Sequence, residues 1–262
     1  MVGKDDRMLK AVYGPVPSWR LGRSLGIDPI CKRKVCSFDC VYCQLGRTTE
    51  KTVERRVFVE GRKLREDLKD IWRKVKGKAD VVTLSGTGEP ELAENLGELI
   101  DIAKEITGLK VVVLTNSSLM ENSEVRRNLA KADMVVAKLD SPNQELFKRI
   151  NRPHPSIKFE KILEGMKRFR SEFKGEYALQ MMFIDLNKDH ALEMRRLAEE
   201  IKPDEIQIDT PIRTSPVRSL DPKEIDEIKN VFKGMNYISV YDRERPRVEI
   251  IDRNETLERR PE

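Results

Sequence analysis

Short runs rich in Val, Ile and Leu recur along the chain, and stretches with helical spacing of apolar residues separate them. Apolar runs of this length are typical of parallel strands that are buried on both faces. Repeated strand–helix alternation predicts a parallel sheet with right-handed crossovers. We expect strands at residues 24–30, 79–85, 109–116, 133–139, 177–184 and 205–209.

Two of the intervening segments carry clear apolar stripes at helical spacing. Gly108 follows the first stripe as a candidate C-terminal cap, and Asp221-Pro222 supplies an N-cap and a first-turn proline for a last helix that ends near Lys233. The first stripe comprises Leu92, Leu96, Leu99, Ile100, Ala103 and Ile106, and the second comprises Phe159, Ile162, Leu163, Met166 and Phe169.

The number of strand–helix units limits the architectures that the chain can form. Six strand–helix units are visible in 262 residues, whereas a complete eight-unit barrel typically needs about 250 residues for the barrel alone. We therefore expect an α/β fold, a partial (β/α)6 TIM-like barrel with short N- and C-terminal extensions. It would form one domain over 1–262, with a core of about 20–235 and a charged tail over about 243–262. Ligands should bind at the carboxyl ends of the strands.

Neither a membrane span nor a secretory leader is visible in the sequence. No run of about 18 apolar residues occurs, and the first ten residues include five charged ones and lack the apolar stretch of a leader. We expect a cytoplasmic protein that does not contact the membrane. The many Lys, Arg and Glu residues also fit a thermophilic host.

All four cysteines lie close together, at Cys31, Cys36, Cys40 and Cys43. Clustered thiols in a chain of this kind indicate metal ligands, because a disulfide framework would be spread through a small domain. The spacing Cys36-x3-Cys40-x2-Cys43 lets three thiolates bind an iron–sulfur cubane and leaves one iron open. Alternatively, Cys31 is a fourth ligand, and the closed cluster serves electron transfer or structure.

The cysteine loop with Tyr42 at its aromatic position, Cys-x3-Cys-x-aromatic-Cys, resembles the signature of the radical S-adenosylmethionine (SAM) superfamily. The segment Gly86-Thr87-Gly88-Glu89-Pro90 is similar to the Gly-Gly-Glu-Pro motif of that family, and the resemblance covers most of the chain. It implies the partial (β/α)6 barrel, a 4Fe–4S cluster on Cys36, Cys40 and Cys43, and SAM as the second cofactor. It also implies that residues 86–90 bind the methionine amino group.

The resemblance implies an oxidoreductase in which one electron cleaves SAM and the 5′-deoxyadenosyl radical abstracts a substrate hydrogen. The electron would come from a low-potential donor, a ferredoxin or flavodoxin. Polar or sulfur-containing residues near the ends of later strands are further candidates for contact with SAM, since Lys and Asp in apolar strands need a reason. These candidates are Asn116, Ser117, Lys138, Asp140, Met182 and Thr210.

The N-terminal third is basic, with 19 Lys and Arg against 10 Asp and Glu in residues 1–76, including Arg55 and Arg56. Such an excess can attract a polyanion such as RNA. Segments 13–27 and 44–48 resemble iron–sulfur oxidoreductases related to the synthesis of wyosine in tRNA, so a tRNA base is one predicted substrate. Hydrogen abstraction from a protein or peptide, including activation of a glycyl-radical enzyme, is the alternative.

Overall fold

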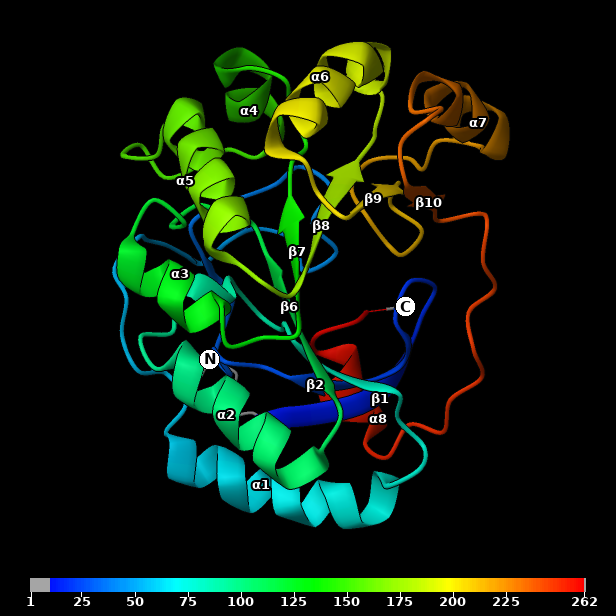
Figure 1. The fold of residues 1–262 in the computed structure, drawn as a ribbon. Coiled ribbons are helices and arrows are strands. Elements are labelled where there is room, and N and C mark those ends of the chain that lie inside the picture. The colour runs from blue at the N-terminus through cyan, green and yellow to red at the C-terminus, as the bar shows by residue number, and fades with distance from the viewer. Residues whose placement is uncertain (1–9, 262) are drawn as a thin grey trace, which may run out of the picture.

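One curled sheet forms the centre of the molecule in the computed structural model, which describes residues 10–261 (Figure 1). Its eight strands lie in the order β1-β2-β5-β6-β7-β8-β9-β10. The first two strands are antiparallel and all others pair in parallel, so the sheet curls into an open, partial barrel as expected. The strands are β1 (Val12–Ser18), β2 (Gly22–Ile27), β5 (Val81–Leu84), β6 (Lys110–Thr115), β7 (Met134–Lys138), β8 (Glu176–Met182), β9 (Glu205–Asp209) and β10 (Tyr237–Ser239).

All six predicted strands form, and two further strands extend the sheet at its edges. The sequence of β1 contains Gly14, Pro15 and Pro17, which argue against a strand. Proline is tolerated there because β1 is an edge strand that pairs only with β2. At the other edge, β10 has three residues, too few to produce a recognisable apolar run.

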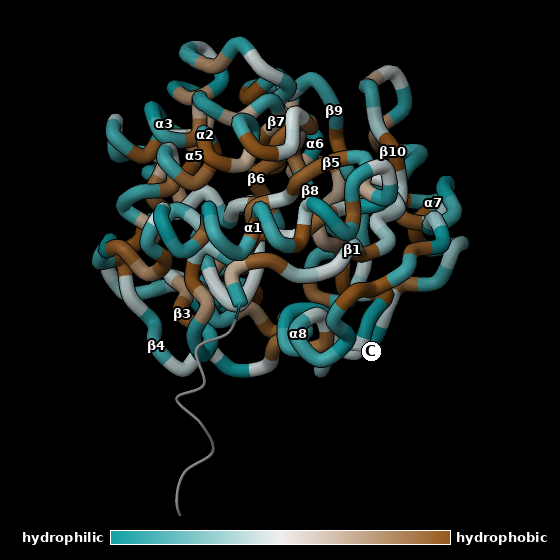
Figure 2. The backbone as a smooth tube through the Cα atoms, turned by 90° about the horizontal axis from the view of Figure 1, so that it is seen from below, coloured by the Kyte–Doolittle hydropathy of each residue, from teal (hydrophilic) through white to brown (hydrophobic). Residues whose placement is uncertain are grey.

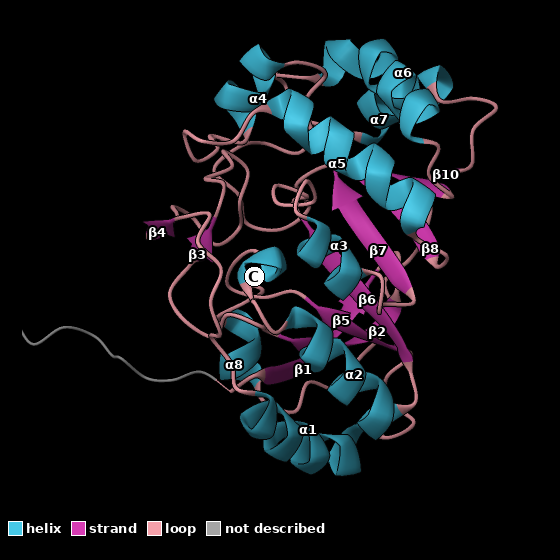
Figure 3. Ribbon diagram, turned by 60° about the vertical axis from the view of Figure 1, so that its left-hand side comes forward, coloured by secondary structure: helices cyan, strands magenta, loops and turns pink. Residues whose placement is uncertain are grey.

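Helices cover the outer face of the sheet, as Figure 3 shows for α1, α2, α3 and α5. The main hydrophobic core lies between these helices and the strands. Gly108 ends α2 in the left-handed conformation, with φ of 66°. Asp221 caps α7 in a capping box with Glu224. The helices are α1 (Gly61–Val75), α2 (Leu96–Thr107), α3 (Ser123–Leu129), α4 (Gln144–Ile150), α5 (Phe159–Glu172), α6 (Ala191–Ile201) and α7 (Pro222–Val231).

The C-terminal segment is not the simple charged extension that we expected. It returns across the molecule and forms the short helix α8 (Arg253–Leu257) beside β1 (Figures 1 and 2). Glu255 and Thr256 are buried, and Arg259 has no exposed surface. A charged sequence can be buried in this way because its charges are paired inside the protein, as described below.

A second, two-stranded sheet holds the start of the cysteine loop. It consists of β3 (Val35–Cys36) and β4 (Glu50–Lys51), which pair in parallel. It lies apart from the main sheet in Figure 3. No helix among residues 10–261 has the length and apolar character required to cross a bilayer.

Candidate functional site

The cysteine loop follows β2 and carries three of the four thiols. Backbone N–H of Cys43 donates to the carbonyl of Cys40 (3.1 Å), which forms a tight turn. The side-chain amides of Asn116 and Asn151 reach the sulfur atoms of Cys36 (3.6 Å) and Cys40 (3.4 Å), respectively. Burial raises the pKa of Cys36, and it raises the pKa of Cys40 to about 11.

These residues fit an iron–sulfur cluster by their chemistry. All three thiols are free, and thiolate sulfur is the ligand type that such clusters take. Two of the sulfur atoms already receive amide hydrogen bonds, which are a common means of tuning a cluster. Within the described residues no three His, Cys, Asp or Glu side chains converge on a single-ion site. A cubane does not need that convergence, since each thiolate binds a separate iron atom.

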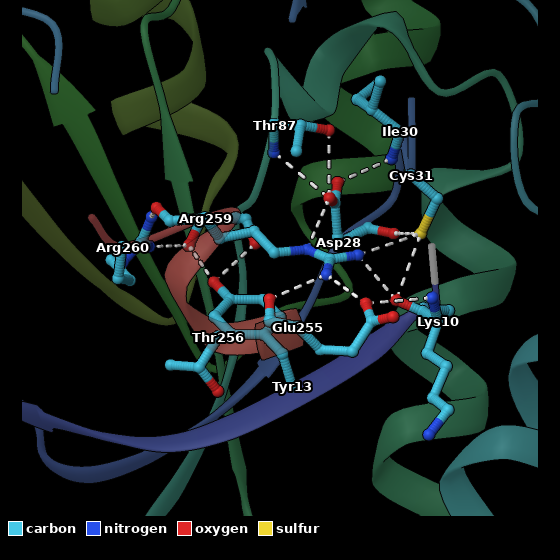
Figure 4. A network of polar contacts seen from close by, with 12 residues as sticks. Lys10, Tyr13, Asp28, Ile30, Cys31, Thr87, Glu255, Thr256, Arg259 and Arg260 are labelled. Carbon is cyan, nitrogen blue, oxygen red and sulfur yellow. Dashed lines mark hydrogen bonds and ion pairs between the residues drawn. The ribbon is translucent and has the colours of Figure 1, made fainter. Parts of the chain in front are cut away.

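Cys31 lies in a different environment, which Figure 4 shows. Its thiol donates to the carbonyl oxygen of Asp28 (3.0 Å), and the guanidinium of Arg259 is 3.8 Å from the sulfur. Burial raises its pKa well above the ordinary range. Cys31 therefore contacts the C-terminal segment, whereas Asn116 and Asn151 contact the sulfur atoms of the other loop cysteines.

The segment 86–90 packs against its surroundings so closely that its glycines have no room for side chains. A Cβ on Gly86 would lie 2.1 Å from Cγ of Asp28, and one on Gly88 would lie 1.8 Å from the carbonyl oxygen of Val35. Thr87 donates to Oδ2 of Asp28 through its backbone N–H (3.2 Å) and its hydroxyl (3.0 Å). The departure from glycine at position 87 thus provides an additional hydrogen bond.

The Glu89 carboxylate is engaged by donors of the protein itself. It accepts hydrogen bonds from the Thr115 hydroxyl (2.6 Å) and from the backbone N–H groups of Asn116 (2.7 Å) and Glu91 (3.1 Å). Pro90 follows as the first residue of a short 3-10 helix, Pro90–Leu92. Glu89 therefore joins the segment to the end of β6, where Asn116 also contacts Cys36.

Four predicted site residues, Tyr42, Lys138, Asp140 and Met182, meet at the ends of β7 and β8. The Tyr42 hydroxyl donates to Asp140, whose carboxylate also accepts from the side-chain amide of Asn151 (2.9 Å) and the backbone N–H of Met182 (3.0 Å). The Lys138 ammonium lies 4.6 Å from the centre of the Tyr42 ring. Burial, assisted by Asp140, raises the pKa of Tyr42 well above its ordinary value.

A cavity of about 280 Å³ opens at this end of the sheet. The predicted residues Tyr42, Cys43, Lys138, Met182 and Thr210 line it. The Thr210 hydroxyl accepts a hydrogen bond from the backbone N–H of Leu220 (2.9 Å). The other predicted residues do not line it: Cys36, Cys40, Gly86, Thr87, Gly88, Glu89, Pro90, Asn116, Ser117 and Asp140. Of these, Asn116 and Asp140 line a smaller neighbouring pocket, and Ser117 has a buried hydroxyl without a hydrogen-bond partner among the described residues.

The sequence did not indicate most of the charged wall of this cavity. Arg20, Arg213, Arg245 and Arg260 line it, and they come from four separate segments. The only carboxylate among the described lining residues is that of Asp209, which accepts from Gln180 (2.5 Å) and Arg20 (3.3 Å). Arg213, Arg245 and Arg260 lie in stretches without a motif, so only the fold shows that they converge with Arg20.

The two arginines proposed for a basic RNA surface have structural roles. Arg55 pairs with Glu124 (3.1 Å) and donates to the carbonyl oxygen of Glu91 (3.1 Å), and only 12% of its side chain is exposed. Arg56 pairs with Glu50 (2.7 Å). Substituting this pair would therefore test stability as well as RNA binding.

Comparison with known proteins shows a match to a protein family and similarity to a relative of known sequence. The family described as the radical SAM superfamily matches residues 33–198. The UPF0026 protein of Synechocystis is 43% identical over 210 residues, which cover 79% of this chain and 78% of that protein.

Solved structures of similar fold have lower sequence identity. Streptococcus suis SuiB bound to S-adenosylmethionine matches with a TM-score of 0.57 at 16% identity, over 84% of this chain and 47% of that one. An archaeal TYW1 structure matches with a TM-score of 0.57 at 18% identity, over 82% of this chain and 72% of that one. At these identities the likeness concerns the fold.

Proposed function

The chain belongs to the radical SAM superfamily, whose enzymes use a 4Fe–4S cluster and SAM, and from this premise we propose that it is a single-cluster enzyme that cleaves SAM reductively. The observation that carries the proposal is the Cys36-x3-Cys40-x2-Cys43 loop, whose last two residues border the cavity at the carboxyl ends of the strands. Since no cysteine follows Cys43, the chain has no further thiols for an auxiliary cluster. A low-potential ferredoxin or flavodoxin is the electron donor that we propose.

When bound, the cluster supplies one electron for cleavage of the SAM sulfonium to methionine and a 5′-deoxyadenosyl radical, which removes a hydrogen atom from the substrate. Cys36, Cys40 and Cys43 are the proposed ligands. Asn116 and Asn151 donate hydrogen bonds toward two of these sulfur atoms and thereby stabilise their thiolate forms.

We place SAM between segment 86–90 and the cavity. Because Glu89 accepts three hydrogen bonds from the chain, its main proposed role is to hold the segment in place. The backbone carbonyl groups of the segment are the acceptors that we propose for the methionine amino group. Lys138, Met182 and Thr210 line the space for the rest of the molecule. The Tyr42–Asp140 hydrogen bond fixes the cysteine loop against the end of β7.

For the substrate we propose a tRNA base. The basic N-terminal third and the cationic wall of the cavity support a polyanionic partner. A base that reacts inside this cavity of about 280 Å³ would have to leave its stack. Four free cysteines suit a reducing compartment, and we propose the cytoplasm.

The first test is 5′-deoxyadenosine formation by the anaerobically reconstituted protein with dithionite, with and without bulk tRNA. We expect product from the wild type, a further rise with tRNA, and background levels from Cys36→Ala. The matched variant Cys31→Ala should keep its iron content and its activity, because Cys31 contacts the C-terminal segment.

Two outcomes would contradict parts of the proposal. Loss of iron in Cys31→Ala would favour the closed four-cysteine cluster. Cleavage that does not respond to tRNA would favour a protein, peptide or small-molecule substrate.

A further inference from the structure

The part of the cavity wall next to Gln44, the residue after Cys43, is strongly cationic. Arg213 follows β9, whereas Arg245 and Arg260 belong to the C-terminal segment, and all three line the cavity. Figure 4 shows Arg260 next to the buried Arg259, on the segment that returns across β1. The three guanidinium groups therefore reach one space from positions far apart in the sequence.

These three arginines have no carboxylate partner in the part of the chain that the structure describes. Arg213 makes one long contact with the side-chain oxygen of Gln44 (3.5 Å), and Arg260 donates to the hydroxyl of Ser85 (2.7 Å) and to the carbonyl of Arg259 (2.8 Å). By contrast, Arg20, the fourth arginine of the wall, is paired with Asp209 (3.3 Å).

The three arginines line one cavity, so their like charges repel one another. Burial, followed by the charges of Arg260 and Arg245, lowers the pKa of Arg213 to about 10. Arg213 and Arg260 are half-buried, whereas Arg245 is exposed. In the absence of a ligand the cluster costs free energy, because two of its cations are partly removed from water and the like charges repel one another. An anion in the cavity would relieve this cost.

We propose that Arg213, Arg245 and Arg260 form a subsite for a phosphate group of the substrate. Guanidinium groups match phosphate oxygens with paired hydrogen bonds, and a cluster of them is typical of phosphate recognition. Trp19 lines the same cavity and offers an aromatic surface for a base that is attached to that phosphate. This inference rests on the proposed function, which it deepens by naming the chemical class of the substrate as a nucleotide phosphate ester.

The test is calorimetric titration of inorganic pyrophosphate into full-length, cluster-reconstituted protein that is saturated with SAM. We expect the double variant Arg213→Gln/Arg245→Gln to bind pyrophosphate at least tenfold more weakly than the wild type. The matched control is Arg62→Gln/Arg73→Gln, which removes the same charge from exposed positions of α1. It should stay within twofold of the wild type.

A further variant separates a change in phosphate binding from a change in folding. Competition experiments then identify which molecule supplies the phosphate group. Arg213→Lys keeps the charge but not the forked geometry, so its affinity should be intermediate. Competition by uridine monophosphate but not by uridine would identify a free nucleotide as the source, and competition by bulk tRNA would identify a polynucleotide.

Three results would overturn the proposal. The first is no measurable binding of pyrophosphate to the wild type, and the second is equal affinity for pyrophosphate in the two double variants. The third is that Arg213→Gln/Arg245→Gln loses affinity only for SAM, which would assign the arginines to the SAM carboxylate. If the wild type binds pyrophosphate as expected but forms no 5′-deoxyadenosine, the proposed reaction fails while the subsite stands.

Discussion

Close contacts and hydrogen bonds of individual atoms hold segment 86–90 in place. Gly86 and Gly88 press against Asp28 and the backbone of Val35, and the hydroxyl of Thr87 reaches the same Asp28 carboxylate. The buried polar atoms of this segment are therefore satisfied by specific partners, which makes the segment sensitive to small substitutions.

Replacing Thr87 by Val should destabilise the protein by about 1 kcal/mol, because it removes one buried hydrogen bond to Asp28 while keeping the side-chain volume. SAM affinity should fall as well, since the segment loses an anchor. The matched control Thr87→Ser keeps the hydroxyl and should retain most of both properties. Urea unfolding and SAM titration provide the two measurements, and equal behaviour of the two variants would contradict the role of the hydroxyl.

Glu91 is the residue for which we predict a pH effect. It is 1% exposed, and its Oε1 has no hydrogen-bond partner among the described residues. Burial, followed by the charge of Glu89, raises the pKa of Glu91 above that of a free glutamate. In the pH range between the ordinary and the raised pKa, the folded state therefore holds a proton that the unfolded chain releases. Stability is lost as the pH rises through this range.

The glutamine side chain of the variant Glu91→Gln cannot ionise. The melting temperature of this variant should therefore fall less than that of the wild type between pH 6 and pH 9. The exposed Glu227→Gln on α7 is the matched control for loss of one carboxylate. Calorimetric melts across this range measure the difference. If the melting temperature of Glu91→Gln falls with pH as steeply as that of the wild type, this carboxyl group does not limit stability.

At the scale of elements, the C-terminal segment with α8 contributes a buried ion-pair network to the sheet. Arg259 donates to Asp28 (3.0 Å) and to Glu255 (2.7 Å), with its side chain fully buried (Figure 4). Asp28 in turn holds Thr87, so one network connects α8, the end of β2 and segment 86–90.

The variant Arg259→Met should destabilise the protein by about 3–5 kcal/mol, because it leaves the buried carboxylate of Asp28 without its cation. Arg247→Met removes an exposed arginine of the same segment and should have little effect. Combining Arg259→Met with Asp28→Asn should cost less than the sum of the two single changes, because both break the same pair. Strict additivity in denaturant unfolding would mean that the pair is not coupled.

Periodicity was sufficient to predict the six central strands, the caps at Gly108 and Asp221, and the partial barrel. It failed at β1, where prolines are tolerated because the strand lies at an edge, and at β10, which is too short. It also failed at α8, because burial of Arg259 depends on a partner 231 positions away in the sequence. Local patterns carry no information about such pairs.

At the scale of the whole molecule, the sheet gathers its functional residues at the carboxyl ends of the strands. That rule singled out Lys138, Asp140 and Met182, and the cysteine motif singled out Tyr42, which the structure places beside them. It could not place Arg213, Arg245 and Arg260, because they lie in loops and in the C-terminal segment, whose paths depend on the complete fold. The residues of the cysteine loop and of the strand ends can thus be predicted from motifs, while the arginines of the cavity wall cannot.

The distance in sequence between Asp28 and Arg259 has a consequence for biosynthesis. The ribosome makes Asp28 early, and it makes Arg259 only after every strand of the sheet has been made. Until then Asp28 has no cation to pair with, and segment 86–90 is attached to an incomplete network. Arg245 and Arg260 arrive in the same late stretch, so the supports of both ends of the cavity are finished together. A nascent chain could thus form most of its barrel well before the network around segment 86–90 and the arginine wall of the cavity are complete.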